Sequence, residues 1–209
     1  MMDYSEQQGY ETAWDRYEAM QPQCEFGTLG LCCKNCMLGP CRIDPFGEGP
    51  QKGVCGATAH TIAARNLTRH AAVGASAHSD HGRDIVHTLL MAAQGEAEGY
   101  EIKYEEKLEK IADEFGIDRE DKDIEEVARE VAEVAMADFG RQEGELRPAQ
   151  RAPESVKERW REQGVMPGGI DRDVVRALHE THMGVNSDAK SLIKTAIRAS
   201  LGDGWGGSM

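Results

Sequence analysis

Apolar side chains recur at helical spacing along most of the chain after residue 58, whereas residues 24–56 have no usable hydrophobic period. The pattern predicts helices over 57–73, 76–95, 105–115, 123–139, 154–162, 171–183 and 189–201, with Ser76 or Ser79 as the cap of the second. In the fourth, apolar residues spaced three or four apart predict one buried face: Ile124, Val127, Val131 and Val134.

The remaining segments lack this periodicity. Residues 1–22 form a polar lead-in with a helix around Thr12–Met20, and residues 24–56 are rich in glycine and proline with no alternating strand pattern. Residues 203–209 resemble a turn that leads into another element, as if a larger protein would continue here. We therefore expect a mainly α protein, a helical bundle (58–209) preceded by an irregular cysteine-rich loop region (1–57).

Composition narrows the class of protein. A length of 209 residues suits one domain or slightly more, and no apolar run approaches the length of a membrane span. The N-terminus lacks the basic-then-apolar pattern of a signal peptide, so we expect a cytoplasmic protein. The net charge of -13 argues against nucleic acid as a partner. Much of the excess acid lies within 96–145 and is typical of solvated helix faces.

All six cysteines lie between Cys24 and Cys55, inside the region without a hydrophobic period. A secreted disulfide scaffold would spread its cysteines along the chain and would need an export signal. In a reducing compartment, cysteines grouped so closely are better explained by bound metal. Bound metal would also stabilise residues 24–56, which have no hydrophobic core of their own. Iron–sulfur ligation is the interpretation that we favour.

Three other interpretations remain open. A zinc site normally has two separated C-x2-C or Cys/His pairs, and only one such pair, Cys33 and Cys36, is present. A disulfide between Cys24 and Cys32 would require an oxidising compartment. The thiols could also be buried by coincidence.

The adjacent residues Cys32 and Cys33 divide the six cysteines into two groups. Adjacent side chains of an extended backbone point in opposite directions, so these two thiolates are poorly placed to reach one compact cluster. A [4Fe-4S] cluster takes four thiolates. One complete set results, called here the cysteine quartet: Cys33, Cys36, Cys41 and Cys55. Nearby glycines, together with Arg42 and Lys52, would support such a cluster and raise its reduction potential.

Cys24 and Cys32, called here the cysteine pair, are left over as half of a four-thiolate site. The economical way to complete it is a second copy of the chain related by a two-fold axis. The sequence therefore predicts a homodimer with a cluster shared at its interface.

The cysteine-rich run resembles a known family. Two stretches resemble the N-terminal region of the anaerobic nickel-dependent carbon monoxide dehydrogenases. They are residues 24–42, which include Cys32-Cys33-Lys34-Asn35-Cys36-Met37-Leu38-Gly39-Pro40-Cys41-Arg42, and the later run Gly53-Val54-Cys55-Gly56-Ala57. Three later segments are also similar to that family: His78-Ser79-Asp80-His81-Gly82-Arg83, Thr181-His182-Met183-Gly184 and Asp203-Gly204-Trp205-Gly206-Gly207-Ser208-Met209.

The resemblance implies a homodimeric oxidoreductase that converts carbon monoxide and water to carbon dioxide, two electrons and two protons, with a ferredoxin-like acceptor. It implies that the cysteine quartet holds a [4Fe-4S] relay within each subunit and that the cysteine pair holds half of a shared cluster. The gap of seven residues between Cys24 and Cys32 is similar to that of the [4Fe-4S] form of the shared cluster. Acetyl-CoA synthase is a further partner that the resemblance suggests. Arg42 and Lys52 could position an acidic ferredoxin.

The chain also departs from the family. Members are considerably longer, and their Ni-Fe-S active site uses a histidine and cysteines further downstream, whereas no cysteine follows Cys55 here. We therefore expect this chain to carry the electron-relay clusters and to lack the catalytic metal site. Two alternatives are a stand-alone electron-transfer or binding module and a hybrid-cluster type reductase, whose N-terminal cysteine spacing lacks the vicinal pair.

A row of His78, His81, Asp84 and His87 falls at three-residue spacing on one predicted helix. Neighbours three apart touch on a helix surface, although each step turns the row by about 60° around the axis. In the resembling family such a row carries protons away from the active site, and imidazole suits that role near neutral pH. Asp84 stands where the family often has histidine. The alternative is a set of solvated surface histidines.

Overall fold

The computed structural model describes residues 2–208 and is mainly helical, which confirms the predicted fold class. It divides into two compact units, Met1–Ile62 and Ala63–Met209. The predicted division at residue 57/58 stays a prediction.

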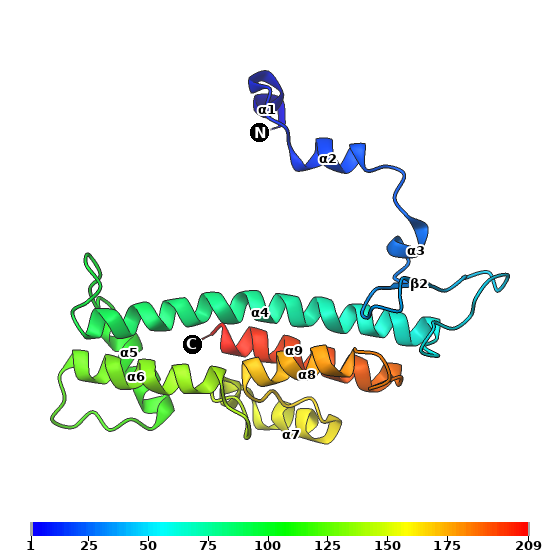
Figure 1. Cartoon of the computed structure of the whole chain (residues 1–209). Helices are drawn as coiled ribbons and strands as arrows, with labels where there is room; N and C mark the ends of the chain where they lie inside the picture. Colours follow the sequence, from blue (N-terminus) through cyan, green and yellow to red (C-terminus); the bar gives the residue numbers. More distant parts are fainter. Residues whose placement is uncertain (1, 209) are drawn as a thin grey trace. The chain divides into compact units, whose positions relative to one another are not determined.

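The first unit contains short elements (Figure 1). These are α1 Met2–Gln8, α2 Ala13–Ala19, α3 Glu25–Thr28, β1 Cys32–Cys33 and β2 Cys41–Arg42. Helix α2 matches the predicted helix, since Thr12 caps it by accepting a hydrogen bond from the backbone of Asp15. Helices α1 and α3 and the two strands were not predicted. Each has seven residues or fewer, which is too short for a hydrophobic period to appear.

Helix α4 (Ala59–Ala93) is continuous, and this corrects the prediction of two helices separated near Ser76 and Ser79. Neither serine caps a helix start. The Ser76 hydroxyl donates to the Val73 carbonyl, 2.8 Å away, within the helix. The buried Ser79 donates to the Asp171 carboxylate at 3.3 Å. Serine therefore bonds inside the helix or to a neighbouring helix here, and its preference for caps was misleading.

Six further helical elements complete the second unit: α5 Glu105–Phe115, α6 Ile124–Phe139, the 3-10 helix η1 Pro148–Arg151, α7 Glu154–Gln163, α8 Ile170–Glu180 and α9 Ala189–Gly206. Most boundaries lie within a residue or two of the prediction. Two do not. Helix α8 ends at Glu180, before Met183, and α9 runs on to Gly206, so the turn predicted from residue 203 is wrong at its start.

Helix α9 lies alongside α4 within this unit (Figure 1). The buried Thr68 hydroxyl of α4 donates to the Leu192 carbonyl of α9 at 2.9 Å. Arg83 of α4 donates two hydrogen bonds to Asp171 of α8, at 2.8 and 2.7 Å. These contacts hold α8 and α9 against the long helix.

The core of the unit has two buried clusters. One forms where α5 packs on α6: Leu108, Ala112, Val127, Ala128 and Val131. The other joins α4, α6, η1 and α8: Val86, Ala132, Ala135, Phe139, Leu146, Ala149, Met166 and Ile170. The predicted face of α6 is confirmed at Val127 and Val131, while Ile124 and Val134 are half-buried. No helix within residues 2–208 is long and apolar enough to cross a membrane.

Candidate metal centre

Strands β1 and β2 form a small antiparallel hairpin that carries three of the cysteines. Cys33 lies directly opposite Cys41, and Cys32 lies opposite Arg42. Directly opposed residues of an antiparallel pair share one face of the hairpin, and successive residues alternate between faces. Cys33 and Cys41 therefore share a face, while Cys32 belongs to the other. The extended backbone on which the division of cysteines depended is confirmed at this point.

Cys36 lies in the loop between the two strands. The loop closes tightly at Gly39, whose backbone N–H donates to the Cys36 carbonyl at 3.4 Å. A Cβ at Gly39 would come within 2.8 Å of the Cys33 carbonyl oxygen. This position therefore needs glycine, because a side chain would push the Cys36 loop away from the strand.

Cys55 lies in a turn that is placed next to Cys41. Gly53 donates to the Ala57 carbonyl at 2.8 Å, and Gly56 donates to the Gly53 carbonyl at 2.8 Å. The Val54 N–H of the same turn donates to the Cys41 Sγ at 3.4 Å. A Cβ at Gly53 would lie 3.4 Å from that sulfur. The structure thus brings the Cys55 turn to the cysteine face of the hairpin.

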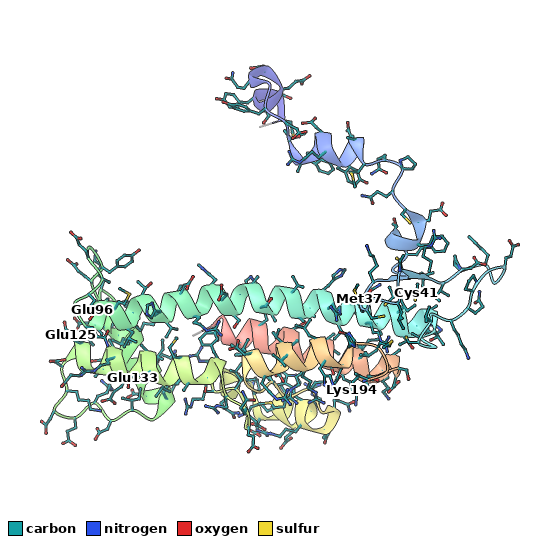
Figure 2. All side chains as sticks on the ribbon, in the orientation of Figure 1. Met37, Cys41, Glu96, Glu125, Glu133 and Lys194 are labelled. Carbon is teal, nitrogen blue, oxygen red and sulfur yellow. The ribbon has the colours of Figure 1, made fainter. Side chains whose placement is uncertain are left out.

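A small apolar core lies next to the cysteine quartet and includes Cys33. Ile43 and Ile62 are almost completely buried, with 1% and 0% of their surface exposed, and Ala57 and Cys33 pack with them. The Ile43 N–H donates to the Leu31 carbonyl at 3.0 Å and extends the hairpin by one bond. Figure 2 labels Cys41 of β2 and Met37 of the loop between the strands, and Met37 is exposed.

The cysteine pair sits on a different part of the same unit. Cys24 is exposed at the N-terminal end of α3, and Cys32 is half-buried in β1. The Arg42 guanidinium lies 5.2 Å from the centre of the Phe26 ring, which ties α3 to β2 by a cation–π contact. This contact joins α3, which begins after Cys24, to the hairpin that contains Cys32.

Arg42 and Lys52 both line one open hollow of about 490 Å³ on this unit, together with Phe26 and Cys41. Asp44 lies at its edge and organises the following loop, since its carboxylate accepts hydrogen bonds from three backbone N–H groups. The bond from Phe46, followed by that from Gly49, holds the pKa of Asp44 below its ordinary value. The cations predicted near the cysteines thus share a concave surface with an acidic group.

The donor set fits an iron–sulfur cluster. The cysteine quartet is grouped on one hairpin and one turn, Gly53 leaves room beside the Cys41 sulfur, and a backbone N–H already points at this Sγ. Among residues 2–208, no three His, Cys, Asp or Glu side chains converge on the position of a single metal ion. The assignment of individual cysteines as ligands stays a prediction.

Sequence reasoning gave no role to Asn35, which lies in the hairpin loop next to Cys36. Its side-chain Nδ2 is buried and has no hydrogen-bond partner among the described residues. The signal in the sequence was an amide placed between two candidate ligands, Cys33 and Cys36.

The histidine row lies on one helix, as predicted, although this helix is the continuous α4 and does not begin near Ser76 or Ser79. His78, His81, Asp84 and His87 are all exposed. The His78 Nδ1 lies 2.8 Å from the Asp203 carboxylate of α9, so the first member of the row has an acidic neighbour on another helix. A proton-carrying role stays a prediction.

Comparison with known proteins assigns a family. The Prismane/CO dehydrogenase family model matches residues 31–209, so the chain belongs to this family. It is 54% identical over 209 residues to carbon monoxide dehydrogenase 1 of Methanosarcina acetivorans, covering 100% of this chain and 33% of that protein. The chain therefore spans about a third of the length of this relative.

Two solved structures have the same fold. One is a nickel-free carbon monoxide dehydrogenase from Thermococcus sp. AM4, with a TM-score of 0.93 and 50% identity over 99% of this chain and 33% of that one. The other is described as an acetyl-CoA synthase/carbon monoxide dehydrogenase with NiZn[Fe4S4] and NiNi[Fe4S4] clusters in its alpha subunits. It has a TM-score of 0.91 and 41% identity, over 98% of this chain and 31% of that one.

Proposed function

We propose that the chain is the N-terminal electron-relay part of an anaerobic carbon monoxide dehydrogenase with a ferredoxin-type acceptor. The observation that carries the proposal is the placement of Cys33 opposite Cys41, with the Cys55 turn donating a backbone N–H to the Cys41 sulfur. Membership of the family and the high identity to a carbon monoxide dehydrogenase support the reaction.

The cysteine quartet would hold one [4Fe-4S] cluster in each chain, which when bound transfers single electrons. The protein's own contribution is to fix the sulfurs and the donors around them. The Val54 N–H and the cations Arg42 and Lys52 stabilise added negative charge, so they favour the reduced state. Gly53 leaves room beside the Cys41 sulfur, and Gly39 allows the loop to approach the Cys33 carbonyl.

The cysteine pair would hold half of a second cluster, completed by the same pair of a partner subunit. The exposure of Cys24 supports a site at a subunit boundary, because a ligand that a second chain must help to enclose has to lie at the surface. Electrons arriving at the quartet would leave through this shared cluster.

An external carrier would dock near the shared cluster, and an acidic ferredoxin suits the hollow lined by Arg42 and Lys52. Acetyl-CoA synthase is a further proposed partner, since one relative with the same fold is described as a complex containing it. The protein would work in the cytoplasm. The histidine row of α4 would carry protons, with the Ni-Fe-S site supplied by sequence outside this chain.

Anaerobic reconstitution of the chain with iron and sulfide tests the proposal. We expect a broad absorption band and, after reduction by dithionite, the electron paramagnetic resonance signal of a reduced [4Fe-4S] cluster. Cys36→Ala should reduce both signals, because it removes one quartet ligand. Met37→Ala is the matched control, since its side chain is 99% exposed, and should reduce neither.

Two results would overturn the proposal: tetrahedral zinc–thiolate binding without iron uptake, or equal signals in Cys36→Ala and the control. A second candidate is a stand-alone electron-transfer module that would hold its clusters on the same cysteines. Both functions predict no carbon monoxide oxidation by this chain alone when nickel is supplied. Reading the coding sequence after Met209 distinguishes the two functions, because only the enzyme requires further metal ligands there.

A further inference from the structure

The side chain of Asn35 is the buried group of the hairpin loop that the proposed function leaves without a purpose. Its Nδ2 is buried and has no acceptor among the described residues. Buried side-chain donors are nearly always hydrogen-bonded, because an unmade bond leaves the desolvation of the group uncompensated. An acceptor that completes this site is therefore expected.

The position of Asn35 limits what the acceptor can be. The residue lies between Cys33, whose side chain shares a face with Cys41, and Cys36 of the same loop. The backbone carbonyl of Cys36 already accepts from Gly39. The remaining acceptors that the cysteine quartet would gather are sulfur atoms. The site already contains one N–H to sulfur contact of this kind, from Val54 to Cys41.

We infer that the Asn35 amide donates a hydrogen bond to a sulfur atom of the [4Fe-4S] cluster held by the cysteine quartet and raises its reduction potential. The inference rests on the proposed function. A donor aimed at sulfur offsets the negative charge that the cluster gains on reduction, so the reduced state is favoured. Asn35 is then a positioning and tuning residue of the relay and is not a ligand.

Two variants of nearly unchanged shape separate tuning from support of the fold. Asn35→Leu removes the donor without adding charge, and Asn35→Asp replaces the donor with an anionic acceptor. We expect the midpoint potential of the reconstituted cluster to fall in Asn35→Leu and to fall further in Asn35→Asp. Met37→Leu, on the exposed part of the same loop, should leave the potential unchanged.

The potential is measured by redox titration followed by electron paramagnetic resonance, with iron content measured for every sample. If the wild-type chain takes up no cluster, both the proposed function and this inference are overturned. If the cluster assembles equally in all variants and the potential does not move, only the Asn35 inference is overturned. A simple loss of iron without a change in the potential of the residual cluster would also overturn it.

A direct measurement needs no variant and covers the case in which the substitutions prevent folding. The chain contains only two other asparagines: Asn66, within α4, and Asn186, in the connection before α9. Labelling only the side-chain amide of asparagine with 15N and recording electron nuclear double resonance of the reduced cluster should give a coupling to one nitrogen, Nδ2 of Asn35. Absence of this coupling in a fully loaded sample would contradict the inference.

Discussion

At the scale of single residues, close approaches of backbone to backbone decide what the helical unit tolerates. Gly169 precedes α8, and a Cβ at this position would overlap the carbonyl carbon and oxygen of Arg141. Gly204 of α9 is also a glycine, but nothing lies within 4 Å of the place where its Cβ would be. The two positions therefore predict opposite effects of the same substitution.

Gly169→Ala should lower the free energy of unfolding by about 1–3 kcal/mol or more, since overpacking forces the backbone to move. Gly204→Ala should raise it by about 0.5–1 kcal/mol, because alanine is the better helix former at an exposed interior position. Urea titration followed by circular dichroism measures both. Equal effects of the two substitutions would show that the Arg141 contact does not constrain residue 169.

Asp138 is the residue on which two arginines of the unit converge. Its side chain is fully buried, it pairs with Arg141, and it accepts a hydrogen bond from the backbone N–H of Arg147 at 3.2 Å. Asp138→Ala should destabilise the fold by about 1–3 kcal/mol, because it leaves the Arg147 backbone N–H without its acceptor and removes the partner of the partly exposed Arg141. Asp80→Ala is the control, since Asp80 is exposed and 3.4 Å from Arg83, and should cost about 0–1 kcal/mol. Similar losses in thermal unfolding would contradict this account.

At the scale of elements, α7 is held by an ion-pair network around Arg161. The Arg161 guanidinium donates to Glu145 at 2.7 and 2.8 Å and to Glu154 at 2.8 Å. The Arg161 hydrogen bond is the main reason that the pKa of Glu145 falls to about 2. Because both side chains are partly exposed, the Arg161–Glu145 pair contributes about 1 kcal/mol or less to the free energy of unfolding.

This network predicts a pH dependence with a definite sign. Because the pKa of Glu145 is lower in the folded state than its ordinary 4.5, its stabilisation is present above pH 4.5 and is lost as the pH falls towards about 2. Glu145→Gln should therefore be less stable than the wild type at pH 7, and the difference should shrink below pH 4.5. Urea unfolding of both proteins across this range measures the difference. A constant difference would mean that charge at Glu145 has no part in the effect.

The helices also show what a sequence reveals about elements. Helices α5 and α6 were predicted almost to the residue, because α6 has a strong capping box at Asp123 and α5 ends on Gly116 in the left-handed conformation. The single helix α4 was divided wrongly, since Ser76 and Ser79 look like caps. Ser76 instead bonds back to the Val73 carbonyl within the helix, and the partner of Ser79, Asp171, is distant in sequence. Gly169 escaped notice because its close approach to Arg141 is a tertiary contact.

At the scale of the whole molecule, the mainly helical fold class was predicted correctly, whereas the assignment of the cysteines as cluster ligands stays a prediction. The cysteines are chemically distinctive and close in sequence, so their grouping followed from spacing, and the opposite faces of Cys32 and Cys33 followed from the geometry of extended backbone. The hairpin itself was missed because each strand has two residues. Asn35 was missed because its lack of a partner is visible only in three dimensions.

The central claim is that the six cysteines divide into a quartet within one chain and a pair shared between two chains. Native mass spectrometry of the anaerobically reconstituted protein tests it most directly. We predict a dimer with about twelve iron atoms, from one [4Fe-4S] cluster in each chain and one between them. The variant Cys24→Ser/Cys32→Ser should retain about four iron atoms in each chain and lose the shared cluster. A wild-type monomer that carries two complete clusters would contradict the claim.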